Sequence, residues 1–94
     1  MINSTLNKKH ILLVEDDQNL ADRLQHYLNT TYQAQAVVAD NLNKARIALK
    51  MQKPHLVILD RQLRQDDGIE LLQHIRQNPE LEDTISDAIK YVGC

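Results

Sequence analysis

Two short apolar segments, each followed directly by an acidic residue, constrain the fold of this 94-residue chain more than any other feature. The first covers residues 10–14 and is followed by three consecutive acids at 15–17. The second covers residues 55–59 and is followed by Asp60. Neither segment alternates apolar with polar residues, which is typical of a strand covered on both faces in a parallel sheet. We therefore expect two buried parallel strands.

The rest of the chain is dominated by apolar residues at helical spacing. These positions are Leu20, Leu24, Tyr27 and Leu28 in a first group, Leu42, Ala45, Ala48 and Leu49 in a second, and Ile69, Leu72 and Ile75 in a third. Such stripes predict helices over about 19–31, 42–52 and 69–77. Between the first two helices, residues 33–39 end in an apolar run that predicts a further strand.

The resulting order is strand, helix, strand, helix, strand, helix, which predicts an α/β fold with a parallel sheet and right-handed crossovers. Asp17 or Asn19 is the candidate N-cap of the first helix, and the Asp40–Asn41 pair supplies one for the second. No repeat or Gly/Ser linker divides the chain, so we expect one domain over 10–79 after a flexible lead at 1–9.

Composition excludes several functional classes. Hydrophobic residues make up 43% and charged residues 26%, which is typical of a globular domain, and the absence of Phe and Trp predicts an aliphatic core. No apolar run approaches a membrane span, and the first residues lack the apolar stretch of a signal peptide. A single cysteine, Cys94, predicts a reducing, cytoplasmic location. The net charge of −2 argues against binding to nucleic acid or to a membrane surface.

The acids at the strand ends are the candidate site. Ligands of open parallel sheets bind at the carboxyl ends of the strands. If the two apolar strands are neighbours, Glu15, Asp16 and Asp60 converge there, and their repulsion requires either protonation or a hard divalent cation such as Mg²⁺. Acids also follow strands simply because strand ends meet solvent and helices favour acidic caps. The residue pattern leaves both interpretations open.

Three segments together, residues 10–17, 56–60 and 67–72, resemble the receiver domain of bacterial two-component response regulators. The resemblance covers about residues 10–79. It implies a flavodoxin-like parallel sheet with helices on both faces, in which the complete fold has five βα units in the strand order 2-1-3-4-5. This chain accounts for about three of those units, in the order 2-1-3.

The resemblance also implies a role for each matching residue. Glu15 and Asp16 correspond to the acidic pair that holds Mg²⁺, and Gln62 to the position whose backbone carbonyl completes the metal shell. Asp60 corresponds to the aspartate that receives a phosphoryl group from a histidine kinase or a phosphotransfer protein. Gly68 corresponds to the glycine before the third helix. Such a domain is a phosphoacceptor rather than an enzyme, apart from its own phosphorylation and dephosphorylation.

The last residues depart from the receiver pattern. Receivers carry a Ser or Thr after a fourth strand and a Lys after a fifth, but the apolar residues of 80–94 recur at helical spacing. They are Leu81, Ile85, Ala88, Ile89 and Val92. We expect a divergent helical tail with Thr84 as a cap, and hence a C-terminally truncated receiver. The strand at 56–59 would then form a sheet edge that is open to pairing with a second copy. The alternative function is a degenerate receiver that acts only as a protein-interaction module or has no function.

The four histidines, His10, His26, His55 and His74, fall on separate predicted elements without metal-ligand spacing. We expect them to be surface or strand-end residues.

Overall fold

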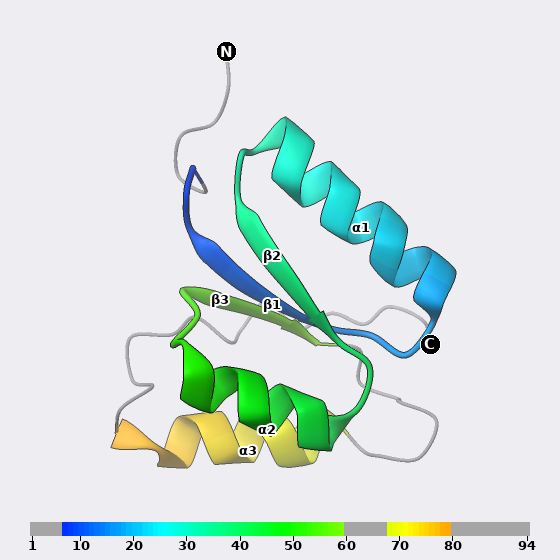
Figure 1. Cartoon of the computed structure of the whole chain (residues 1–94). Helices are drawn as coiled ribbons and strands as arrows, with labels where there is room; N and C mark the ends of the chain where they lie inside the picture. The colour runs from blue at the N-terminus through cyan, green and yellow to red at the C-terminus, as the bar shows by residue number, and fades with distance from the viewer. Residues whose placement is uncertain (1–6, 60–67, 80–94) are drawn as a thin grey trace.

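Three parallel strands in the order β2-β1-β3 form the sheet of the computed structural model, which describes residues 7–59 and 68–79. The elements are β1 (His10–Val14), α1 (Gln18–Thr31), β2 (Gln35–Ala39), α2 (Leu42–Met51), β3 (Leu56–Leu59) and α3 (Gly68–Gln77). Helix α1 covers one face of the sheet, while α2 and α3 lie side by side on the other (Figure 1). The predicted α/β class, strand order and helices on both faces are confirmed.

Strand β1 is the centre of the sheet and pairs with both other strands. Leu12 lies opposite Val37 of β2 and Val57 of β3, and Val14 lies opposite Ala39 and Leu59. Ile11 and Leu13 face α1, and all four apolar residues of β1 are at most 3% exposed. Burial on both faces explains why the segment shows no alternation.

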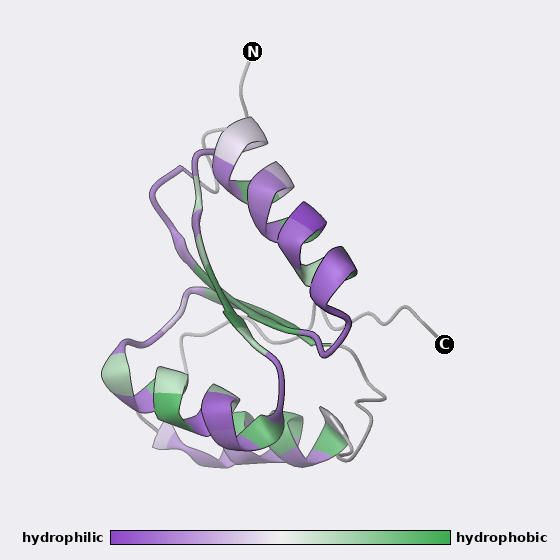
Figure 2. Ribbon diagram, turned by 45° about the vertical axis from the view of Figure 1, so that its right-hand side comes forward, coloured by the Kyte–Doolittle hydropathy of each residue, from purple (hydrophilic) through white to green (hydrophobic). Residues whose placement is uncertain are grey.

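The two faces carry separate cores. The larger core joins the sheet to α2 and α3, and its buried residues are Leu12, Val14, Ala39, Leu42, Ala45, Leu49, Val57, Leu59, Leu71 and Ile75. The smaller core lies on the α1 face and contains Ile11, Leu28, Ala34 and Ala36. Figure 2 shows the hydrophobic strands between helices whose outer sides are largely hydrophilic. Both cores are aliphatic, as the composition predicts.

The buried side of α1 differs from the predicted stripe. Ala21 and Leu28 are buried, whereas Tyr27 is 51% exposed. Its ring packs edge-to-face against Tyr32 with the centroids 5.7 Å apart, and a hydrogen bond with Tyr32 raises the pKa of Tyr27. Tyr27 therefore belongs to the apolar stripe of the sequence but not to the core, because this phenol keeps its polar end in solvent.

The rotation of α3 also differs from expectation. The expected stripe contained Ile69, Leu72 and Ile75, but Leu71 is fully buried, while Ile69 and Leu72 are only half-buried. Ile75 is buried as expected. Because α3 has apolar residues around more than one side, contact with the sheet and α2 decides which of them enters the core.

No helix in the described ranges is long and apolar enough to cross a membrane. The predicted tail at 80–94 lies outside those ranges, as does most of the predicted lead. Within the lead, the Lys8 N–H donates to the carbonyl of Gln33, and the carbonyl of Lys9 accepts from the Gln35 N–H. These bonds join the chain before β1 to the beginning of β2.

Candidate functional site

The carboxyl end of β1 places a buried acid at the edge of the sheet. Glu15 follows Val14 directly, and its backbone N–H donates to the carbonyl of Ala39 over 3.0 Å. This bond extends the β1–β2 pairing by one residue and holds Glu15 in place. Glu15 is only 6% exposed, which is uncommon for glutamate. A buried carboxylate is stable only when hydrogen bonds or positive charges replace its contacts with water.

The chain after Glu15 supplies part of that compensation. The Asp17 N–H donates to Glu15 Oε2 over 3.0 Å, and Asp17 Oδ1 in turn accepts from the Leu20 N–H over 3.1 Å. Asp17 is therefore the N-cap of α1, which decides between the two predicted candidates in its favour. The N-terminus of α1 also favours negative charge at this position. The three consecutive acids thus differ: Glu15 is buried, Asp16 is half-buried and Asp17 is an exposed cap.

Replacing Asp17 by alanine is expected to lower the free energy of unfolding by about 0.5–2 kcal/mol, because the N-terminus of α1 loses its acceptor. Asp17→Asn keeps an acceptor oxygen and should stay within about 0.5 kcal/mol of the original protein. Urea unfolding followed by far-ultraviolet circular dichroism measures both. Equal losses in the two variants would show that the charge, rather than the cap, matters.

Asp40 is a further acid that directly follows a strand, but its contacts are structural. Its Oδ1 lies 3.2 Å from Lys44 Nζ and accepts from the side-chain amide of Asn41. Asn41 itself caps α2 by accepting from the Lys44 N–H over 2.8 Å. The contacts of Asp40 are thus explained by its place at a solvent-facing strand end beside the start of a helix, without a functional role.

Asp60 and Gln62, the remaining predicted site residues, lie outside the described residues. The structure places the end of β3 at the same edge as Glu15, because Leu59 pairs with Val14. Glu15 and Asp16 provide carboxylate oxygens, the donors that Mg²⁺ prefers. Within 7–59 and 68–79 there is no group of three or more His, Cys, Asp or Glu side chains that could hold a metal ion. The described part of the site therefore contains two of the predicted ligands, Glu15 and Asp16, and their carboxylate oxygens suit a hard divalent cation.

The opposite end of the sheet contains a histidine pair that the sequence interpretation missed. The rings of His10 and His55 stack with centroids 5.7 Å apart and planes 11° from parallel, and His55 Nδ1 accepts from the His10 N–H over 3.0 Å. The two residues are 45 positions apart and lie at strand ends on separate elements, as predicted, but their contact was not predicted. The available signal was that both apolar segments begin with histidine, and neighbouring parallel strands bring their first residues together.

Comparisons with known proteins agree on one family. The model of the response regulator receiver domain matches residues 11–86. The response regulator ArlR of Staphylococcus epidermidis is 39% identical over 69 residues, which cover 72% of this chain and 31% of ArlR. The chain spans 30% to 31% of the length of the curated relatives that it matches.

Solved structures show the same similarity. The signal receiver domain of a DNA-binding response regulator (merR) from Colwellia psychrerythraea 34H matches with a TM-score of 0.77 and 30% identity, over 83% of this chain and 64% of that one. The Mn²⁺-bound form of the response regulator Rcp1 matches with a TM-score of 0.71 and 31% identity, over 83% of this chain and 62% of that one.

Proposed function

Because the chain belongs to the family of response regulator receiver domains, we propose that it acts in a phosphorelay by accepting a phosphoryl group on Asp60 from a histidine kinase or a phosphotransfer protein. The observation that carries this proposal is the buried Glu15 at the sheet edge where Val14 and Leu59 are paired. Asp60 is the next residue after Leu59, so an acid follows each of these two neighbouring strands.

In the proposed reaction, a carboxylate oxygen of Asp60 attacks the phosphorus of a phosphohistidine. The new O–P bond forms as the P–N bond breaks, and the imidazole leaves with the electron pair of that bond. A carboxylate is a weak nucleophile, so alignment of the donor and stabilisation of charge on the phosphoryl oxygens supply most of the catalysis. Glu15 contributes through its fixed place at the end of β1, held by the hydrogen bonds of its N–H and of its carboxylate.

Glu15, Asp16, Asp60 and the backbone carbonyl of Gln62 would hold Mg²⁺ in this scheme. Bound Mg²⁺ neutralises negative charge on the phosphoryl oxygens. The carboxylate chemistry of Glu15 and Asp16 supports a divalent cation, as does the Mn²⁺-bound state of the similar Rcp1.

The proposal extends to partners and location. We expect a cytoplasmic domain whose chemistry is limited to its own phosphorylation and dephosphorylation, in line with the signalling role of the family. Pairing of two copies through the outer edge of β3 remains a prediction. The described residues pair β3 with β1 on one side only.

Phosphorylation with acetyl phosphate and Mg²⁺, followed by intact-protein mass spectrometry, tests the proposal. The original protein is expected to gain the mass of one phosphoryl group, and Asp60→Asn is expected to gain none. Asp40→Asn is the matched control, because Asp40 also follows a strand but is engaged by Lys44 and Asn41. Asp40→Asn is expected to gain one phosphoryl group, as the original protein does.

Circular dichroism must first show that each protein is folded. A folded original protein without an adduct would refute the phosphoacceptor role and support the alternative of an interaction module. An adduct that survives in Asp60→Asn would place the reaction at another residue.

A further inference from the structure

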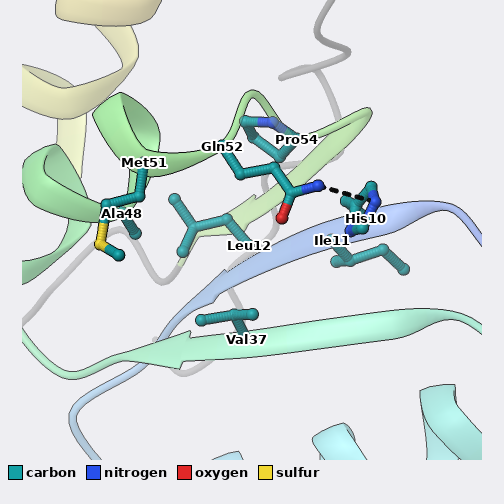
Figure 3. A pocket seen from close by; sticks show the side chains of 8 residues that line it. All are labelled: His10, Ile11, Leu12, Val37, Ala48, Met51, Gln52 and Pro54. Carbon is teal, nitrogen blue, oxygen red and sulfur yellow. Dashed lines mark hydrogen bonds between the residues drawn. The ribbon is translucent and has the colours of Figure 1, made fainter.

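An apolar notch lies on the α2 face of the sheet, toward the end opposite to the acids (Figure 3). It has a volume of about 180 Å³. Its apolar lining residues are Ile11, Leu12, Val37, Ala48, Met51 and Pro54. The last turn of α2 forms one wall, and the strands β1 and β2 form the floor.

The rim of the notch exposes large apolar side chains. Val37 is 54% exposed and Met51 is 80% exposed. Val37 shares the α2 face of the sheet with Ala39, but only Ala39, at 2% exposure, is covered by the larger core. Ile47, one turn before Met51 on α2, is 51% exposed and continues the apolar surface. Grouped exposed apolar residues around a hollow are typical of binding sites, and methionine is common at surfaces that adapt to a partner.

One polar group is oriented within this apolar surface. The Gln52 side-chain nitrogen lies 2.9 Å from His10 Nε2, and His10 stacks on His55. This contact turns the carboxamide oxygen of Gln52 into the notch (Figure 3). Fixed in this way, the oxygen is positioned to accept a hydrogen bond from the backbone N–H of a bound peptide.

Among the described residues, the charged sequence neighbours of the lining residues are lysines. Three lysines, Lys9, Lys50 and Lys53, each adjoin a lining residue in the sequence, and all three are exposed. None of them forms an ion pair within the described ranges. The acids of those ranges follow the carboxyl ends of the strands or lie near the starts of α1 and α3; they are Glu15, Asp16, Asp17, Asp22, Asp40 and Glu70. An acidic partner therefore complements the described residues at this end of the sheet.

We propose that the notch binds an acidic peptide segment of a partner protein that inserts one aliphatic or aromatic side chain between Val37 and Met51. A dry cavity of about 150 Å³ accommodates a benzene-sized group, so the volume suits a single side chain. The lysines would attract the flanking acids, and Gln52 would fix the peptide backbone. The notch lies at the end of the sheet opposite to Val14 and Leu59, and the inference does not depend on phosphorylation.

Fluorescence anisotropy with synthetic peptides tests the inference. The probe is a fluorescein-labelled peptide of glutamate and aspartate residues with one central leucine, and the comparison peptide has serine in its place. The leucine peptide is expected to bind and the serine peptide to bind at least about tenfold more weakly, since a buried anchor carries most of the energy of such a contact. Nitrogen–proton correlation spectra should show the shifts concentrated at Val37, Ala48 and Met51.

Variants on opposite faces of the sheet provide matched controls. Met51→Glu should weaken binding about tenfold, whereas Tyr27→Glu, which introduces the same charge at an exposed residue of α1, should leave it within about twofold. Lys53→Glu should weaken binding about threefold, more than Arg23→Glu on α1. Raising the salt from about 50 to about 300 mM should also weaken it.

Several results would overturn the inference. They are equal binding of the leucine and serine peptides, no binding at all, or binding that Met51→Glu leaves unchanged. Self-association of the original protein in sedimentation velocity that Met51→Glu abolishes would identify a second copy as the occupant instead. Binding to vesicles of anionic lipid that is lost in Met51→Glu would identify a membrane.

Discussion

The Leu71→Ala variant is expected to be less stable than the original protein by about 2–5 kcal/mol, the range for removing a buried leucine from a packed core. Leu71 is fully buried in the larger core, where α3 packs on the sheet and α2. A small domain has a total stability of only about 5–15 kcal/mol. The substitution therefore removes a large fraction of it, and a marginal protein would unfold.

Leu72→Ala is the matched control for this prediction. The two leucines are adjacent on α3 and lose the same atoms, but Leu72 is only half-buried at the rim of the core. Its loss should cost about 1 kcal/mol, since less apolar area returns to water. Urea unfolding of both variants, followed by circular dichroism, measures the difference. A larger cost for Leu72 than for Leu71 would contradict the rotation of α3 in the structure and restore the stripe expected from spacing.

This comparison shows where periodicity stops being informative. The pattern of apolar residues located all six elements of the described fold. A strand buried on both faces leaves a continuous apolar run, and a helix buried on one side leaves apolar residues at helical spacing. For α2 it also identified the buried side, Ala45 and Leu49, since the other side carries several charges. For α3, spacing favoured Ile69 and Leu72, but apolar residues also lie on a neighbouring side of the helix, and packing in the larger core selected Leu71.

The candidate site divides in a similar way. The position of Glu15 followed from one local rule, that ligands bind where parallel strands end, and the structure places it there as a buried residue. The sequence before the helical stripe left Asp17 and Asn19 as candidate caps, and the structure selects Asp17. The stacking of His10 on His55 depends instead on strand order and register, because these residues meet only after β1 and β3 pair. Such contacts require the tertiary structure, even when each residue is locally unremarkable in the sequence.

The outer edge of β2 illustrates this dependence and leads to the second prediction. Ala36 is buried, and its backbone groups face α1 rather than β1. Asn29 Oδ1 accepts from the Ala36 N–H over 3.0 Å, and the side-chain amide of Gln25 donates to the Ala36 carbonyl over 2.8 Å. Asn29 and Gln25 are one helical turn apart, so together they occupy the positions that a neighbouring strand would use. Unprotected strand edges promote pairing between chains, and these two side chains close the edge at Ala36.

Asn29→Ala is expected to destabilise the protein by about 1–3 kcal/mol, because it leaves the buried N–H of Ala36 without its acceptor. Asn19→Ala is the matched control on the same helix: Asn19 is exposed near the N-terminus of α1, and alanine is the better helix former, so its effect should be small or slightly stabilising. Urea unfolding measures both variants. Equal stability of the two would show that water replaces the Asn29 oxygen without cost.

The same substitution should also affect association when it is combined with Gln25→Ala. The double variant exposes both the N–H and the carbonyl of Ala36, so β2 becomes able to pair with a strand of another molecule. Sedimentation velocity over a range of protein concentrations should then show self-association that is stronger in the double variant than in Asn29→Ala alone. A double variant that is folded and associates no more than the original protein would show that α1 closes the β2 edge by its bulk, independently of these two hydrogen bonds.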